Sequence, residues 1–291
     1  MKLSYYILYP ICCLVGWLPY KAQFLLSDVI RWLLHYVLKY RVKVVRENLR
    51  NAFPEATSEE LRMVEKRFYN HLADVFLEIL SVASVSKKQI MRRIEFTNVE
   101  EIERLTKGRS WICAMAHYGS WEYTISYSLH TQHDGVLAVY RPLHSRGIDE
   151  YFKKVRSRFG ARPVAMNDIV REVIRQRLQG RSVAVALIAD QTPPRNESHP
   201  WFTFLNQPTQ FFLGTEKIAL KLGMPVAFLH IDKVKRGFYR ARFELIYDGV
   251  EKVTEYEVTR RYIEHLERMI VERPELWMWS HRRWKHKRCK E

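Results

Sequence analysis

A histidine and a glutamate five positions apart, His117 and Glu122, are the side chains whose spacing is most suggestive of chemistry. They follow Trp111–Ala116, an uncharged run with the length and composition of a buried strand. A carboxylate that accepts a proton from one imidazole nitrogen leaves the other nitrogen free to act as a general base. We therefore predict that Glu122 orients His117 as a base and that the substrate supplies a hydroxyl or amine nucleophile.

This spacing also restricts where the two side chains lie. On one continuous helix, positions five apart are separated by about 140° around the axis and do not meet. His117 is therefore expected at the strand end or in the following turn, with Ser120 capping a helix and Glu122 in its first turn. The alternative is a buried structural histidine next to an unrelated glutamate at a helix start.

Two more apolar runs end in polar residues. The run Val136–Tyr140 leads into Arg141, and the run Val183–Ala189 leads into Asp190 and Gln191. An aspartate after seven apolar residues is costly to bury unless it is paired, and we predict an arginine from a neighbouring element as its partner. The alternative is that Asp190 is a helix cap or a turn residue.

A predicted helix that ends at Gly160 carries Arg156 and Arg158 in its last turn. A cation at this position can stabilise a developing oxyanion or hold an anionic substrate. It can equally do no more than compensate the helix dipole. Both interpretations of Arg156 stay open.

Apolar runs of strand length alternate with segments of helical periodicity from about residue 97 onward. This alternation predicts an α/β fold with a mixed sheet flanked by helices. Further strands are expected at Pro225–Ile231 and Tyr239–Tyr247, and helices near 121–131, 148–158, 168–178, 213–222 and 257–272. Thr57 and Glu60 form a capping-box pattern at the start of another helix.

The N-terminal 40 residues differ in composition from the rest. Leu3–Tyr20 has no charged residue over 18 positions, which just reaches a bilayer-spanning length. Ala22–Tyr40 predicts an amphipathic helix with a wide apolar face and one polar stripe formed by Asp28, Arg31, His35 and Lys39. We predict membrane-associated helices over residues 1–40 and a catalytic domain over 41–291. The alternative for the second segment is a buried core helix.

The 48 basic and 32 acidic residues give a net charge of +16, which indicates an anionic partner. That partner could be nucleic acid, a phospholipid surface or an acidic protein. No RNA-binding or helix-turn-helix signature is present, and we expect no nucleic acid. No cysteine belongs to a C-x-x-C pair, and no Walker or G-x-G-x-x-G motif occurs, so we expect neither a metal nor a nucleotide cofactor.

Together the motifs resemble the bacterial late acyltransferases of lipid A biosynthesis, the lauroyl/myristoyl transferase family. The family has an H-x4-E/D motif, matched by His117 and Glu122, and a P-E-x-x-M-W-x-H-R-R-aromatic-K signature, matched by residues 274–285. The remaining matches are Tyr140-Arg141-Pro142, Arg156, Asp190 with Gln191, and the run Val45–Pro54.

This resemblance implies a glycerolipid-acyltransferase-like fold, an inner-membrane anchor and an active site on the cytoplasmic face. It implies an acyl-carrier-protein thioester as donor and a hydroxyl of a lipid A precursor, an anionic glycolipid, as acceptor. His117 would then be the base and Glu122 its orienting carboxylate. Arg141 or Arg156 would stabilise the oxyanion or hold the phosphosugar, and Asp190 would hold an arginine.

Two alternatives remain. An acyltransferase of the same architecture could act on a lysophospholipid, an aminolipid or a phosphatidylinositol mannoside, because a base and its carboxylate recognise only the acceptor hydroxyl. A non-catalytic basic protein bound to a membrane or nucleic acid is the alternative from a different class.

Overall fold

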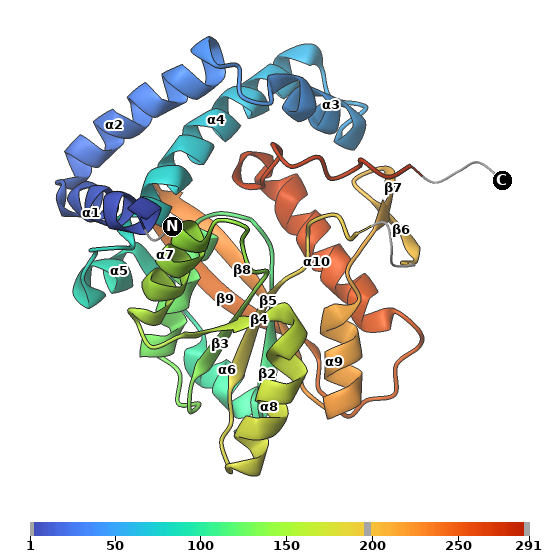
Figure 1. The fold of residues 1–291 in the computed structure, drawn as a ribbon. Coiled ribbons are helices and arrows are strands. Elements are labelled where there is room, and N and C mark those ends of the chain that lie inside the picture. Colours follow the sequence, from blue (N-terminus) through green and yellow to red (C-terminus); the bar gives the residue numbers. More distant parts are fainter. Residues whose placement is uncertain (1–2, 195–198, 288–291) are drawn as a thin grey trace.

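Within residues 3–194 and 199–287, which the computed structural model describes, seven strands form one sheet at the centre of the molecule (Figure 1). The strand order is β1-β9-β8-β2-β5-β3-β4, and every neighbouring pair is parallel except the antiparallel pair β8–β9. The strands are β1 (Ile94–Phe96), β2 (Trp111–Met115), β3 (Val136–Tyr140), β4 (Arg162–Ala165), β5 (Ala184–Ile188), β8 (Val226–Lys235) and β9 (Phe238–Tyr247). The predicted mixed α/β sheet is confirmed.

A separate antiparallel hairpin pairs β6 (Trp201–Phe204) with β7 (Gln207–Gln210). The helices are α1 (Leu3–Trp17), α2 (Tyr20–Trp32), α3 (Val42–Ala52), α4 (Ser58–Ser81), α5 (Lys87–Arg93), α6 (Val99–Thr106), α7 (Arg146–Ser157), α8 (Ile169–Leu178), α9 (Gly214–Leu222) and α10 (Glu257–Glu272). Shorter pieces are the π-helical turn η1 (Leu33–Val37) and the 3-10 segments η2 (Trp121–Leu129), η3 (Met166–Asp168) and η4 (Pro274–Leu276).

The segment predicted as a helix near 121–131 is the 3-10 helix η2, and its first residues differ from the expectation. Ser120 precedes η2 but its side chain makes no capping hydrogen bond. The predicted cap is therefore wrong. The capping box of α4 is confirmed: the Thr57 hydroxyl accepts the Glu60 N–H, and the Glu60 carboxylate accepts the Thr57 N–H at 2.7 Å.

Helices α1 and α2 pack on α4, and α1 also packs on α7 (Figure 1). Part of the polar stripe of α2 and η1 contacts the rest of the protein: His35 lies 2.8 Å from Glu65 of α4, and Asp28 accepts from Arg236 at 2.8 Å. The neighbouring Ser27 hydroxyl donates to Asp74 of α4 at 2.7 Å. Apolar residues lie on the outside, with Leu25 68% and Trp32 54% exposed. In the part of the chain that the structure covers, no helix combines the length and the apolarity needed to cross a bilayer.

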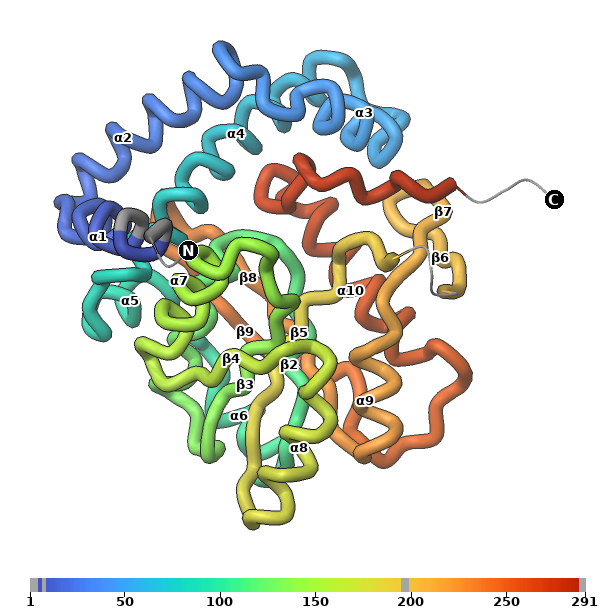
Figure 2. The backbone as a smooth tube through the Cα atoms, viewed as in Figure 1, coloured from blue at the N-terminus to red at the C-terminus, as the bar shows by residue number. Residues whose placement is uncertain are grey.

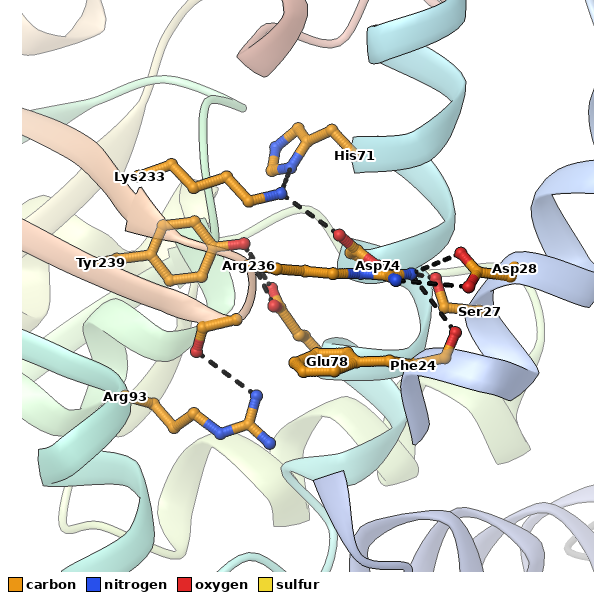
Figure 3. A network of polar contacts seen from close by, with 11 residues as sticks. Phe24, Ser27, Asp28, His71, Asp74, Glu78, Arg93, Lys233, Arg236 and Tyr239 are labelled. Atoms are coloured by element: carbon orange, nitrogen blue, oxygen red, sulfur yellow. Dashed lines mark hydrogen bonds and ion pairs between the residues drawn. The ribbon is translucent and has the colours of Figure 1, made fainter. Parts of the chain in front are cut away.

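A network of charged side chains joins α2, α4 and the β8–β9 hairpin (Figure 3). Asp74 of α4 accepts hydrogen bonds from Lys233 Nζ at 3.2 Å and from Arg236 Nε at 2.9 Å. Arg236 also donates to Asp28 of α2 at 2.8 Å. A buried glutamate of α4, Glu78, accepts from the Tyr239 hydroxyl. This network attaches the N-terminal helices to the sheet.

The segment after α10 lies alongside α3 (Figure 2). The Asn48 amide of α3 donates to the carbonyl oxygens of Trp279 and His281 at 2.8 and 3.0 Å, and Arg41 donates to that of Ser280 at 2.9 Å. Two motifs at opposite ends of the sequence, residues 45–54 and 274–285, are therefore in contact.

Candidate active site

The parallel pairing of β2 with β5 brings His117 and Asp190 together. Met115 and Ile188, the last residues of β2 and β5, are paired with each other. His117 and Asp190 each lie two residues beyond these strand ends. Parallel neighbours end at the same edge of a sheet, so side chains at equal distances beyond the paired residues meet there. The site therefore lies at the carboxyl ends of two adjacent central strands, where α/β proteins commonly bind ligands.

His117 is oriented by Asp190. Its Nδ1 lies 2.8 Å from Asp190 Oδ1, and its backbone N–H donates to Asp190 Oδ2 at 3.1 Å. The aspartate is 2% exposed, whereas the His117 side chain is 21% exposed. An ionised aspartate accepts only, so Nδ1 carries the proton and Nε2 keeps its lone pair. The imidazole is thus held in the orientation that a general base needs, with Nε2 directed away from Asp190.

Burial raises the pKa of the Asp190 carboxyl, but attraction to His117 and hydrogen bonds from His117 and Trp277 outweigh it and leave the pKa below its ordinary value. The predicted arginine partner of Asp190 is therefore wrong. The carboxylate is satisfied by an imidazole, a backbone amide and an indole, and none of its hydrogen bonds comes from a guanidinium in the described residues.

Glu122 does not contact His117, and the predicted pairing of these two residues is wrong. The Glu122 carboxylate is buried in η2 and forms a two-point ion pair with Arg156 of α7, with Nε–Oε1 and Nη2–Oε2 distances of 2.6 and 3.1 Å. Both carboxylate oxygens accept from one guanidinium, so Glu122 is the ion-pair partner of Arg156 and not the group that orients the imidazole. This ion pair joins η2 to α7 next to the site.

Gln191 lies next to the second ring nitrogen of His117, Nε2. Its side-chain amide nitrogen is 3.3 Å from His117 Nε2, which places an N–H donor at the imidazole lone pair. A substrate hydroxyl that gives its proton to Nε2 would occupy this same position. The prediction that Gln191 belongs to the site is consistent with this contact, and the amide marks the direction in which the base points.

The turn after His117 depends on a glycine. Gly119 has φ +57°, and a Cβ atom at this position would lie 2.7 Å from Ile231 Cγ2. Its N–H donates to the Leu276 carbonyl at 3.0 Å. A larger residue would be strained by its backbone angle and would collide with β8. Glycine therefore lets the chain turn sharply and keep the imidazole at the sheet edge.

Trp277 is a site residue that sequence reasoning placed in a motif but gave no role. Its indole N–H donates to Asp190 Oδ2 at 2.9 Å. Tyr262 of α10 donates its hydroxyl to the Met115 carbonyl at 2.8 Å, which fixes the end of β2. Trp277 of the C-terminal signature thus helps to position the Asp190 carboxylate. The only sequence signal was a tryptophan, a donor when buried, within a run of motif residues.

The other predicted cations lie apart from the imidazole. Arg141 is exposed directly after β3, and Arg158 donates to the Val82 carbonyl. Arg283 is buried near Asp190, donates to the Gln210 carbonyl at 2.6 Å, and burial lowers its pKa to about 10. Arg156 is the one arginine of the predicted site set that is joined directly to another member of that set in the described residues.

The chain matches the family described as bacterial lipid A biosynthesis acyltransferase over residues 2–286. It is also similar to a curated protein, the lipid A biosynthesis acyltransferase of Haemophilus influenzae, with 28% identity over 152 residues. That alignment covers 51% of this chain and 47% of the relative, so the match spans about half the length of the curated protein.

Proposed function

Because the family match extends over nearly the whole chain, the protein belongs to the bacterial lipid A biosynthesis acyltransferase family, and we propose that it transfers a fatty acyl chain from an acyl-carrier-protein thioester to a hydroxyl of a lipid A precursor. The observation that carries this proposal is the hydrogen bond between His117 Nδ1 and the buried Asp190, which leaves Nε2 free. This arrangement suits activation of a hydroxyl supplied by the substrate.

In the proposed reaction, His117 Nε2 takes the proton of the acceptor hydroxyl as its oxygen attacks the thioester carbonyl. The Asp190 carboxylate stabilises the imidazolium that forms. The C–O bond is made, the tetrahedral intermediate collapses with loss of the C–S bond, and the thiolate takes the proton back from Nε2. The products are an ester and a free thiol, and every proton is accounted for without a redox step.

The outward apolar face of α2 and η1 supports the proposal that the protein binds to a membrane surface. Leu25, Val29 and Trp32 are all more than half exposed, while Ser27 of α2 and His35 of η1 bind α4. A helix that turns its polar side to its own protein and its apolar side outward is suited to the headgroup region of a bilayer. We place the protein at the cytoplasmic face of the inner membrane.

A cavity of about 480 Å³ between α2, α4 and the β8–β9 hairpin supports an anionic acceptor. Its lining includes Asp28 and Asp74, which are paired with Arg236 and Lys233, and two further cations, Arg31 and Lys66. The cavity lies beside the helix with the exposed apolar face, where a phosphate of a membrane glycolipid would be held. The acidic acyl carrier protein is the second anionic partner that the charge of +16 favours.

The test is acyl transfer in vitro with acyl carrier protein thioesters of several chain lengths and a panel of acceptors. We expect one acyl mass to be added to a lipid A precursor by the wild-type protein and none by His117→Gln. Acyl transfer to a lysophospholipid or an aminolipid alone would show that the acceptor is that lipid and not a lipid A precursor. No transfer to any acceptor by a folded, vesicle-bound protein would overturn the proposal.

A further inference from the structure

Three side chains from three elements converge on the face of the sheet that α10 covers. They are His230 of β8, Glu244 of β9 and His265 of α10, and none of them belongs to the catalytic site. His230 is 7% exposed, and His265 is half-buried. Two imidazoles and one carboxylate are a ligand set that proteins use for divalent transition metals.

The spacing of the three ligand atoms matches a metal ion better than it matches a hydrogen-bond network. His230 Nε2 is 3.0 Å from Glu244 Oε2 and 3.3 Å from His265 Nδ1, and the third side of the triangle is 3.7 Å. A triangle with these sides has a circumradius of about 2 Å, the usual length of a zinc–nitrogen or zinc–oxygen bond. An ion slightly out of its plane would therefore bind all three atoms without movement.

Protons alone satisfy these contacts poorly. If His230 Nε2 carries a proton and donates it to Glu244, that nitrogen has no lone pair left for His265. If instead His265 Nδ1 donates to His230 Nε2, a nitrogen lone pair faces a carboxylate oxygen at 3.0 Å. A single proton on His230 Nε2 can serve both contacts only as a shared, weaker hydrogen bond, whereas a cation is attracted by all three ligand atoms.

Arg242 is the competing cation. Its Nη1 donates to the same oxygen, Glu244 Oε2, at 3.0 Å. A carboxylate oxygen has two lone pairs, so it can accept from Arg242 and still bind a metal. The Glu244 side chain is 39% exposed, which leaves an open path for an ion and for a water as fourth ligand.

We propose that His230, Glu244 and His265 form a zinc site with one open coordination position. Burial lowers the pKa of His230 to about 4 and also lowers that of His265, so both rings are neutral and offer lone pairs at pH 7. The tetrahedral preference of zinc fits three protein ligands plus water.

The consequence of this site is structural. A zinc ion would join the middle of α10 to β8 and β9, and α10 leads directly into η4 and Trp277. Trp277 donates to Asp190, and Tyr262, one turn before His265, fixes the end of β2. Bound metal would therefore hold in place the helix that supports the catalytic carboxylate, without taking part in acyl transfer.

The experiment uses the full chain, without an affinity tag, loaded with ZnCl2 and then passed through a desalting column. Elemental analysis should give about one zinc per chain, and thermal unfolding should move to higher temperature with zinc and back with a chelator. Cobalt in place of zinc should give the intense visible absorption of a four-coordinate site.

Glu244→Gln and His265→Gln should each weaken zinc binding. Second-shell partners alone are worth roughly 10- to 100-fold in metal affinity, so loss of a ligand should cost at least that. His144→Gln, at an exposed loop histidine, is the matched control and should retain the metal. Arg242→Gln should also retain it.

Wild-type protein that holds no zinc after loading and shows no shift in its unfolding temperature would overturn the site. Equal zinc content in Glu244→Gln, His265→Gln and the control would do the same, since the metal would then bind elsewhere. These readouts do not depend on acyl transfer, so they separate this proposal from the proposed activity.

Discussion

Asp190 and Glu122 are both buried carboxylates close to the sheet edge, but their partners differ. Asp190 contacts the imidazole, and Glu122 contacts a guanidinium. We expect Asp190→Asn to lower kcat by about 10²–10⁴-fold while leaving the fold intact, because the amide still accepts from Trp277 but no longer stabilises an imidazolium. Steady-state kinetics with a fixed donor would measure this, and circular dichroism would verify the fold.

Unchanged kcat in Asp190→Asn would show that a group other than Asp190 orients the His117 imidazole. Comparing Asp190→Asn with Glu122→Gln separates the roles of the two carboxylates more clearly than either variant alone. The two substitutions differ in which property they change, the rate or the stability.

Glu122→Gln should act mainly on stability. Removing the charge leaves Arg156 largely buried without its counter-ion, and breaking such a pair costs about 3 kcal/mol or more when both partners are fully buried. The Arg156 side chain is 20% exposed, so we expect a smaller loss, seen as a lower unfolding temperature. The matched double variant Glu122→Gln/Arg156→Gln should recover part of it. A normal unfolding temperature with a rate as low as that of Asp190→Asn would contradict this assignment.

The sequence placed His117 just after a buried strand, as the structure has it, but assigned it the wrong partner, for a physical reason. His117 ends an apolar run, and that is a local signal. Its partner is 73 residues away, and the contact arises because β5 is the neighbour of β2. Spacing within one segment cannot reveal strand order, and Glu122, five residues on, is only the nearest acid along the chain. Two apolar runs that both end in polar groups were the available clue.

At the level of elements, α2 shows the same dependence on distant partners. Its polar stripe was visible in the sequence, but the direction of that stripe is set by charged residues of α4 and the β8–β9 hairpin (Figure 3). The apolar side is consequently the outer one. Propensity and periodicity predict that a helix forms, while packing decides which side faces outward.

The outward apolar face predicts a specific effect on membrane binding. Leu25→Glu and Trp32→Glu should reduce flotation with anionic vesicles, since each places a charge where an apolar side chain would enter the bilayer. The unfolding temperature in detergent should stay unchanged, because both side chains are more than half exposed.

Leu178→Glu is the matched control for that experiment. Leu178 is 84% exposed and ends α8, at the opposite end of the molecule from α2 in Figure 1. The Leu178→Glu substitution adds the same charge at an apolar position that is even more exposed than Leu25 or Trp32. Equal loss of flotation in all three variants would show that net charge, and not the α2 face, controls binding.

Over the whole molecule, the strand–helix alternation was predictable because buried strands and amphipathic helices leave local patterns. The predicted strands correspond to β2, β3, β5, β8 and β9. The short edge strands β1 and β4 and the hairpin β6–β7 were not predicted, because three or four residues carry too little periodicity. They are stabilised by pairing, as Ile94 with Tyr239 and Leu137 with Arg162 illustrate.

The network around Asp74 predicts how the N-terminal helices are held. Asp74→Asn would leave Lys233 and Arg236 without a buried counter-charge, and we expect a lower unfolding temperature together with faster amide exchange in α2. Glu95→Gln, in the exposed pair with Arg240, is the control and should change stability by about 0.5 kcal/mol or less. Equal effects of both variants would argue against a special role for the network.

The last prediction concerns stability and pH, and it follows from His281 in the C-terminal segment. Burial lowers the pKa of His281 to about 4, and its Nε2 accepts the Thr192 N–H at 3.3 Å, which requires the neutral ring. In the unfolded chain the same ring titrates near its ordinary value of about 6.5. Between about pH 6.5 and pH 4 the unfolded chain therefore binds a proton that the folded protein does not. Stability should fall as the pH is lowered through this window and show no further loss from His281 below it.

Unfolding temperatures measured with EDTA, which removes any bound metal, should fall less steeply with pH in His281→Gln than in the wild type. His144→Gln, at an exposed position, should follow the wild-type curve, and identical slopes in all three proteins would rule out His281 as a source of acid sensitivity.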